Sequence, residues 1–274
     1  MLPLPQLTPH PVRRLHVVGC HRSGTTLMAE LLGSCFDIPG RVDHEQGLWV
    51  PVEAESGVFL TKKPPDTIRI RTAFLMDPRL YVIAMIRDPR GVITSRHKTK
   101  PDVYFSSFWR WQQYLQAIMA LEGHPRFLVV RYEDLVADPD AVQDRIAERF
   151  EFLQPISRFS RFPEGARIHE RARISLNGVR AVDSASLSRW REALPRVKGE
   201  LIRHPEMIDW LIRLGYEPDD AWTAALDGVE PFFGDYKNER PHVWRRTETS
   251  LRFALRTLRY LWRRQRTARA GLAP

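Results

Sequence analysis

Residues 19–26, Gly-Cys-His-Arg-Ser-Gly-Thr-Thr, have the residue types and the spacing of a site for a phosphate-like anion. The segment lies between a short apolar stretch and the start of a helical pattern. It matches the phosphate-binding pattern G-x-x-x-x-G-K-[ST] except at Thr25. Thr25 replaces the lysine that reaches the β- and γ-phosphates of a triphosphate, so triphosphate chemistry is not expected. Backbone N–H groups at a helix N-terminus, two hydroxyls and Arg22 can still hold an anion.

Three other polar residues, Lys62, Arg87 and Tyr132, follow short apolar runs that are typical of buried strands. Such runs alternate along the chain with helical patterns, which indicates a parallel sheet with helices on both faces. Ligands of these sheets bind beyond the carboxyl ends of the strands. We therefore expect the three side chains to meet the 19–26 loop in one crevice.

Apolar periodicity, prolines and capping residues predict the individual elements. The predicted strands are Arg14–Cys20, Val58–Leu60, Leu80–Ile86 and Phe127–Val130. The predicted helices are Ser23–Ser34, Pro65–Met76, Pro89–His97, Phe105–Leu121 and Pro139–Phe150, the last with Asp138 as its N-cap. The expected fold class is α/β: a parallel sheet with a phosphate-binding loop, flanked by helices on both faces, and a helical C-terminal extension.

Positive charge is concentrated near the C-terminus. The net charge is +9, and the stretch Arg245–Arg269 contains nine arginines against one acidic residue, Glu248. The rest of the chain is close to neutral, so the high isoelectric point does not indicate a nucleic-acid partner. We divide the chain into an α/β domain, residues 1–244, and a basic tail, residues 245–274.

Within the tail, Thr247–Ala268 has the pattern of a basic amphipathic helix. Leu251, Leu255, Leu258 and Trp262 form its apolar stripe, and arginines fill the remaining face. Such a helix can dock on the α/β domain, pair with a second copy in a homodimer, or lie on an anionic membrane surface. We favour docking, because the stripe is narrow.

The sequence favours a cytoplasmic protein, which could also contact a membrane peripherally through the tail. No apolar run is long enough to span a bilayer. The proline-rich N-terminus lacks the regions of a signal peptide. Cys20 and Cys35 are the only cysteines, which provide no disulfide framework and fit a reducing compartment.

Four segments together resemble the sulfotransferases that use PAPS (3′-phosphoadenosine 5′-phosphosulfate), especially the bacterial and Golgi-type branch. They are Arg-Ser-Gly-Thr-Thr-Leu at 22–27, Leu-Thr-Lys-Lys-Pro at 60–64, Ile-Arg-Asp-Pro-Arg-Gly-Val-Ile-Thr-Ser at 86–95 and Arg-Tyr-Glu-Asp-Leu-Val-Ala-Asp-Pro at 131–139. A later segment, Ser186–Trp190, resembles the family's Ser-x-Gly-Arg-Trp, with Ser188 in place of the glycine.

The resemblance implies a set of donor-binding residues. The 5′-phosphosulfate is implied to lie on the loop residues Arg22, Ser23, Gly24, Thr25 and Thr26.

The 3′-phosphate is implied to bind Arg87 and Ser95, the latter in the helix after the strand. The alternative for Arg87 is an ion pair with Asp88 or Asp134. Tyr132 is implied to pack on the adenine, and its alternative is an ordinary half-buried tyrosine.

The resemblance also implies catalytic groups. Lys62 is implied to neutralise charge on the bridging oxygen, with Lys63 as the alternative one residue away. Family members of the Golgi type carry a carboxylate base after the first helix. Here that segment contains Glu45, His44 and Asp43, and we favour them in that order.

The implied function is transfer of a sulfuryl group from PAPS to a hydroxyl or amine, leaving PAP as product and needing no metal. The acceptor class stays open between a saccharide, a glycolipid, a peptide and a small alcohol. The alternatives are a P-loop small-molecule kinase, which the residue at Thr25 disfavours, and a non-catalytic nucleotide-binding protein.

Overall fold

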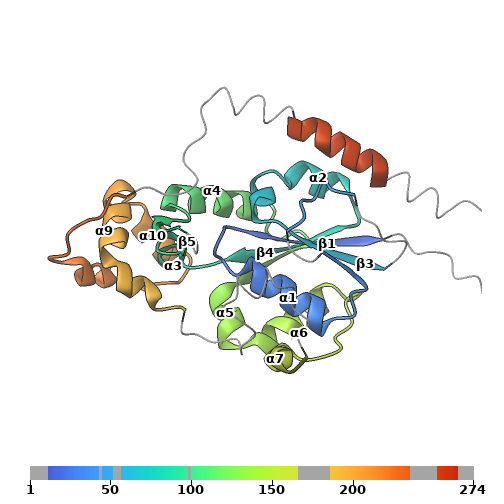
Figure 1. The fold of residues 1–274 in the computed structure, drawn as a ribbon, viewed down its shortest axis with the longest axis horizontal. Helices are drawn as coiled ribbons and strands as arrows, with labels where there is room; N and C mark the ends of the chain where they lie inside the picture. Colours follow the sequence, from blue (N-terminus) through green and yellow to red (C-terminus); the bar gives the residue numbers. More distant parts are fainter. Residues whose placement is uncertain are drawn as a thin grey trace, which may run out of the picture.

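The core of the protein is a five-stranded parallel sheet (Figure 1). The computed structural model describes residues 12–42, 45–51, 57–97, 100–165, 186–234 and 252–264. The strand order is β2-β3-β1-β4-β7. The strands are β1 (Arg13–Gly19), β2 (Gly40–Arg41), β3 (Val58–Lys62), β4 (Leu80–Ile86) and β7 (Phe127–Arg131). Because both faces are covered, β1 and β4 are almost wholly buried.

Helices cover one face of the sheet through a core that includes Leu31, Met85, Ile146 and Phe159. This layer lies below the sheet in Figure 1. It consists of α1 (Thr25–Cys35), α5 (Tyr132–Ala137), α6 (Pro139–Arg149), the 3₁₀ helix η2 (Phe159–Arg161) and α7 (Phe162–Gly165).

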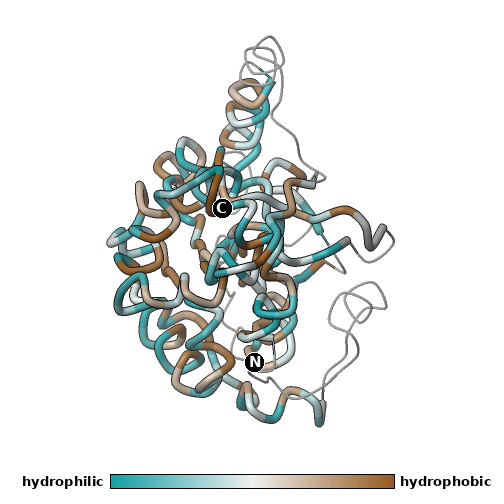
Figure 2. The backbone as a smooth tube through the Cα atoms, turned by 90° about the vertical axis from the view of Figure 1, so that its left-hand side faces the viewer, coloured by the Kyte–Doolittle hydropathy of each residue, from teal (hydrophilic) through white to brown (hydrophobic). Residues whose placement is uncertain are grey.

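The other face packs on a second core that includes Phe74, Val82, Ile118 and Leu261. Its layer consists of the 3₁₀ helix η1 (Pro64–Ile68), α2 (Arg71–Met76), α4 (Phe108–Met119) and a helix over residues 252–264. Hydrophobic and hydrophilic residues alternate along the helices around the sheet, as expected for helices with one buried face (Figure 2).

A third cluster, with Trp111, Trp190, Val197 and Leu211, joins α4 to the remaining helices. These are α3 (Pro89–Ile93), η3 (Arg189–Ala193), α9 (Leu194–Arg203), α10 (Met207–Arg213) and η4 (Ala221–Leu226). The two-stranded antiparallel sheet pairs β5 (Arg96–His97) with β6 (Lys100–Tyr104).

The predicted fold class is confirmed. All four predicted strands are present within two residues of their expected bounds, and Leu80–Ile86 matches β4 at both ends. Asp138 caps α6, since its Oδ1 accepts a hydrogen bond from the Ala141 N–H at 2.9 Å. The short edge strand β2 was not predicted, because two residues carry no periodicity.

Two predicted helices are wrong in their extent. The predicted helix Pro65–Met76 is divided into η1 and α2. The Thr67 hydroxyl explains the tight first part, because it donates to the Pro64 carbonyl at 2.6 Å and accepts from the Gly19 N–H at 2.9 Å.

The predicted helix Pro89–His97 ends at Ile93, so Ser95 lies beyond the helix and not in it. The chain leaves the helix there because the Ser95 carbonyl accepts from the Phe105 N–H at 2.9 Å, beside the β5–β6 pair.

The tail helix docks on the α/β domain, as favoured, but with a different face from the predicted one. Its buried residues are Thr257, Tyr260, Leu261 and Arg264. Leu255, Leu258 and Trp262 of the predicted stripe are 57%, 61% and 55% exposed, and Leu251 lies outside the described residues. The periodicity identified an amphipathic helix, but polar contacts of Tyr260 and Arg264 decide which face is buried.

Candidate functional site

The loop between β1 and α1 has the backbone of an anion site. Arg22 and Gly24 have positive φ values of 71° and 93°. A side chain at Gly24 would bring a Cβ within 2.5 Å of the Tyr132 ring, so only glycine fits. Gly24 is also the N-cap of α1 and offers no side-chain acceptor. The first N–H groups of α1 therefore stay available for an anion.

Ser23 fixes the turn of this loop. Its side chain is fully buried, and its hydroxyl donates to the Cys20 carbonyl at 2.6 Å. Thr25 is buried at the start of α1, whereas Thr26 is partly exposed. The Thr26 hydroxyl accepts a hydrogen bond from Lys62 across the crevice.

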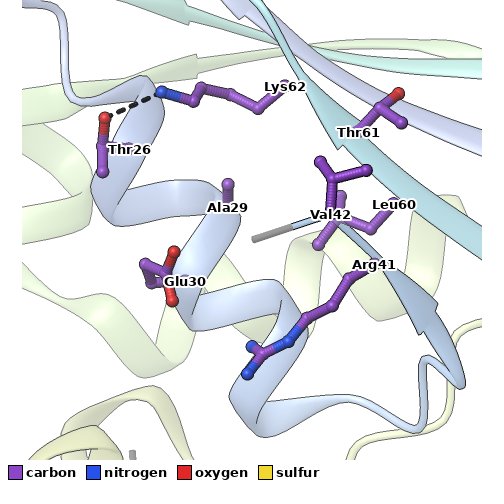
Figure 3. Close-up of a pocket in the computed structure, with 8 residues that line it drawn as sticks. All are labelled: Thr26, Ala29, Glu30, Arg41, Val42, Leu60, Thr61 and Lys62. Carbon is purple, nitrogen blue, oxygen red and sulfur yellow. Dashed lines mark hydrogen bonds between the residues drawn. The ribbon is translucent and has the colours of Figure 1, made fainter. Parts of the chain in front are cut away.

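Lys62 reaches from the end of β3 to this loop (Figure 3). Its Nζ donates to Thr26 Oγ1 at 3.0 Å and to Glu45 Oε1 at 2.9 Å. The Lys62 side chain is 4% exposed and that of Glu45 is 34% exposed. The structure thus joins Lys62 and Glu45, while the Lys63 side chain lies beside Gly47.

Of the three candidate bases, only Glu45 can be placed. His44 and Asp43 fall outside the described residues. The Glu45 carboxylate is partly exposed and bonded to one cation, so one of its oxygens has no partner among the contacts of the described residues.

Arg22 and Arg87 form a second polar group on the loop. Arg22 Nε donates to Ser95 Oγ at 2.5 Å, and Arg87 Nη1 donates to the Arg22 carbonyl at 3.1 Å. Burial lowers the pKa of Arg22, and the neighbouring charge of Arg87 lowers it further. Two adjacent guanidinium groups of this kind are stabilised by a bound anion.

Neither Arg22 nor Arg87 has a carboxylate partner within the part of the chain that the structure describes. Asp88 pairs with Arg90 at 2.7 Å, and Asp134 lies 3.9 Å from Arg131 and 3.7 Å from Arg145. The alternative interpretation of Arg87, an ion pair with Asp88 or Asp134, is therefore not what the structure contains.

Tyr132 lies between the loop and Arg87. The Arg87 guanidinium is 4.3 Å from the centre of the Tyr132 ring, and Tyr132 Oη is 2.7 Å from Ser186 Oγ. Arg87 Nη2 also donates to the Ser186 carbonyl at 2.8 Å. Sequence reasoning did not include Ser186 in the site, although it begins the late motif-like segment, which was the available signal.

A buried network supports the segment that carries Glu45. The Arg14 guanidinium, on β1, donates to the carbonyls of Gly47 at 3.0 Å and Leu48 at 2.5 Å. Asp66 Oδ2 accepts from the Leu48 N–H at 2.7 Å and lies 3.2 Å from His16 Nε2. Burial lowers the pKa of His16, which favours a neutral ring.

This network could not be predicted from the sequence, because Arg14 and His16 look like ordinary strand residues. They follow one another on β1 at a spacing of two and so lie on one face. The strand alone does not show which of its two faces carries a polar network. The hydrogen-bond partners, which lie within residues 47–66, are known only from the structure.

The helix over residues 252–264 contacts the same segment. Trp49 Nε1 donates to Thr257 Oγ1 at 3.0 Å, and the Trp49 ring meets Phe253 at 4.9 Å. The tail helix therefore helps to hold the segment 45–51, four residues from Glu45.

The arrangement can bind an anion with two phosphate-like groups. One set of donors is Lys62 and Thr26, with the Glu45 carboxylate beside the lysine. The other is Arg22, Arg87 and Ser95, with the Tyr132 ring against Arg87. A carboxylate beside a buried lysine provides a proton acceptor next to a fixed positive charge.

Residues 46–152 match the model of the Sulfotransferase family. The match confirms the resemblance found in the motifs, and it includes Lys62, Arg87, Ser95 and Tyr132. No curated protein matches the chain.

Among solved structures, the chain is similar to the sulfotransferase domain from the Synechococcus PCC 7002 olefin synthase. The identity is 16%, the coverage is 68% of this chain and 90% of that chain, and the TM-score is 0.47. For the sulfotransferase domain from the curacin biosynthetic pathway, the identity is 16%, the coverage is 76% of this chain and 99% of that chain, and the TM-score is 0.46. For retinol dehydratase in complex with androsterone and inactive cofactor PAP, the identity is 13%, the coverage is 73% of this chain and 80% of that chain, and the TM-score is 0.41.

Proposed function

Since residues 46–152 match the sulfotransferase family, we propose that this chain transfers a sulfuryl group from PAPS to a hydroxyl or amine of an acceptor. One structural observation carries the proposal. A lysine-free anion loop lies against a buried lysine that bridges the loop to a carboxylate, through Thr26 and Glu45.

The donor side of the proposal assigns two anion sites. The loop N–H groups with Thr25 and Thr26 would hold the 5′-phosphosulfate. Arg87 and Arg22, with Ser95, would hold the 3′-phosphate. The fit rests on the adjacent guanidinium groups, which lack a carboxylate among the described residues and so suit a doubly charged ligand.

Tyr132 would contact the adenine, because its ring lies at the loop beside Gly24 and Arg87. Its hydroxyl is bonded to Ser186, which keeps the ring in one orientation. When bound, PAPS supplies an activated sulfuryl group on a phosphate leaving group.

The acceptor side assigns Glu45 as base. Its carboxylate takes the proton of the acceptor hydroxyl as the acceptor oxygen forms its bond to sulfur and the bond from sulfur to the bridging oxygen breaks. Negative charge then develops on the departing phosphate oxygen. Lys62 Nζ, fixed by Thr26 and Glu45, is the cation placed to stabilise it.

A small hollow that opens to solvent lies beside Lys62 and leaves this side of the lysine accessible to an acceptor (Figure 3). Thr26, Ala29 and Glu30 of α1 line it, together with Arg41 and Lys62. We infer that a hydroxyl-bearing acceptor enters here, since the hollow ends at the group that faces the leaving oxygen.

We infer a reducing, cytoplasmic location. Cys20 and Cys35 are both free and buried, and burial raises the pKa of Cys20 to about 12 and that of Cys35 to about 11. Both thiols therefore act as apolar core groups and need no oxidising environment. No helix of the described residues has the length and apolarity to cross a bilayer.

The test is transfer of radiolabelled sulfate. The full chain is incubated with labelled PAPS and an extract of the host cell, and the labelled product is isolated. We expect one labelled compound with wild type and with Lys63→Ala, a loss with Lys62→Ala, and no effect of chelating Mg²⁺. Transfer of labelled phosphate from ATP, dependent on Mg²⁺, would instead identify a kinase and contradict the proposal.

A further inference from the structure

The helix over residues 252–264 presents three different faces around its axis. One face is buried on the α/β domain, and its residues are Thr257, Tyr260, Leu261 and Arg264. The contacts that fix this face are bonds to Asp77 Oδ2 from Tyr260 Oη at 2.5 Å and from Arg264 Nε at 2.8 Å. The helix therefore has a defined orientation, and its other faces point outward.

The second face is apolar and exposed. Leu255, Leu258 and Trp262 follow at spacings of three and four, which places them on one side of a helix. They are 57%, 61% and 55% exposed. Three large apolar side chains in one row on a docked helix form a patch rather than scattered surface residues.

Two further exposed apolar residues of the domain lie close in sequence to the point where the helix is bound. Leu75 and Met76, the last residues of α2, are 50% and 60% exposed. They directly precede Asp77, to which Tyr260 and Arg264 bind. In Figure 1, α2 lies beside the helix drawn in red.

The third face is basic. Arg252, Arg256, Arg259 and Arg263 follow at spacings of four, three and four, and all four are exposed. At 100° per residue this row lies beside the apolar row, between it and the buried face. No acidic residue occurs in the described helix.

We propose that these outward faces bind an anionic lipid surface, with Leu255, Leu258 and Trp262 inserted at the headgroup level and the arginine row on the lipid phosphates. An apolar row bordered by arginines, with a tryptophan, is the pattern of an interfacial helix. A second copy of the chain is a poorer partner, because four arginines would face the same four arginines. Nucleic acid would leave the apolar row in water.

The proposal is independent of the sulfuryl-transfer reaction. It requires only the orientation of the docked helix, and no residue of the proposed donor site takes part in it. A helix held in this way is already ordered, so membrane binding needs no folding step.

The test is flotation of the full chain with vesicles. Vesicles of phosphatidylcholine with about three parts in ten of phosphatidylglycerol should bind the chain, and pure phosphatidylcholine vesicles should bind it much less. Binding to the anionic vesicles should weaken when salt rises from about 0.1 M to about 0.5 M, because exposed charges are screened.

Two double variants address the two faces, and both change only exposed residues. Leu255→Ser with Leu258→Ser should abolish binding, whereas Ile156→Ser with Ile202→Ser, equally exposed elsewhere, should not. Arg256→Gln with Arg259→Gln should weaken binding by about thirtyfold, at roughly one fivefold step per arginine. The matched control is Arg189→Gln with Arg191→Gln.

Three results would overturn the proposal. The first is no binding of folded wild type to anionic vesicles, and the second is an equal loss in the control variants. The third is concentration-dependent dimerisation of wild type that Leu255→Ser with Leu258→Ser removes, which would assign the apolar row to a second copy. Circular dichroism establishes whether each variant is folded. If the leucine variant is unfolded, vesicle binding by the arginine variant tests the proposal.

Discussion

Lys62 is nearly buried, and its ammonium group is shared between Thr26 and Glu45. Its charge is thus held at one position before any donor binds. A fixed charge of this kind stabilises charge that develops during the reaction, and it adds little to the binding of a donor that the loop and Arg87 would hold, as we propose.

We therefore expect Lys62→Ala to lower kcat by about two to three orders of magnitude. The Kd of PAP, measured by calorimetry, should change little. Lys63→Ala is the matched control, since the Lys63 side chain lies beside Gly47 and it is Lys62 that donates to Thr26. The assignment is contradicted if Lys63→Ala loses turnover and Lys62→Ala retains it.

Arg87 provides the second prediction at the residue scale. Arg87→Ala should weaken PAP by about 1.5–3 kcal/mol, the usual value of a hydrogen bond to a charged group. AMP, which has no 3′-phosphate, should bind the variant and wild type alike. Calorimetric titration with both nucleotides checks this. An equal loss of affinity for AMP would contradict the assignment of the 3′-phosphate to Arg87.

The residues that could be predicted are those at strand ends, because a parallel sheet brings all its carboxyl ends to one edge. Lys62, Arg87 and Tyr132 are of this kind. Arg14 and Asp66 could not be predicted, since their role depends on contacts with Gly47 and Leu48 across the sheet face. Those contacts exist only after the chain has folded.

Among the elements, the segment 45–51 is held from three sides. Arg14 binds its carbonyls, Asp66 binds the Leu48 N–H, and the helix over residues 252–264 holds Trp49 through Thr257. Because Glu45 begins this segment, each support acts on the position of its carboxylate. The tail helix is thus connected to the proposed base through one side chain.

We expect Trp49→Ala to lower kcat by about tenfold or more, because a small displacement of a catalytic group is costly. The Kd of PAP should stay the same, since no donor-binding group contacts Trp49. Val50→Ala is the control, because Val50 is 46% exposed and adjoins Trp49. Equal kcat values for the two variants would show that the helix does not position Glu45.

The sequence predicts which helices and strands are present, but it predicts less well where they end and which of their faces is buried. The buried run Leu80–Ile86 could only be a central strand, and β4 has these bounds. The end of α3 depends on the pairing of β5 with β6, and the docked face of the tail helix depends on Asp77. Both are long-range contacts that override local periodicity.

For the whole molecule, Asp77 joins parts of the chain that are far apart in sequence. It follows α2, is 2% exposed, and accepts bonds from Tyr260 and Arg264. Arg264 also donates to the Val12 carbonyl at 2.9 Å, next to the start of β1. The beginning and the end of the described chain therefore meet at Arg264, which the Asp77 carboxylate holds in place.

Burial of Asp77 would raise its pKa, but Arg264 and Tyr260 more than offset this and lower the pKa below the ordinary value of 3.8. A carboxyl group with a lower pKa in the folded state binds fewer protons than in the unfolded state at the same pH. Its contribution to stability is therefore complete above pH 3.8 and is lost as the pH falls through the lower folded-state pKa.

Asp77→Asn should accordingly reduce the free energy of unfolding near neutral pH by about 1.5–3 kcal/mol, the value for a hydrogen bond to a charged group. Urea unfolding of wild type and variant measures the difference at about pH 7 and again at about pH 3. The difference should shrink at the lower pH, because wild type then begins to lose the same charge. Asp144→Asn is the control, since the Asp144 side chain is 62% exposed and ion pairs on the surface contribute little to stability. A difference that is constant across this range, or that grows as the pH falls, would mean that the Asp77 carboxylate is not what holds the two ends of the molecule together.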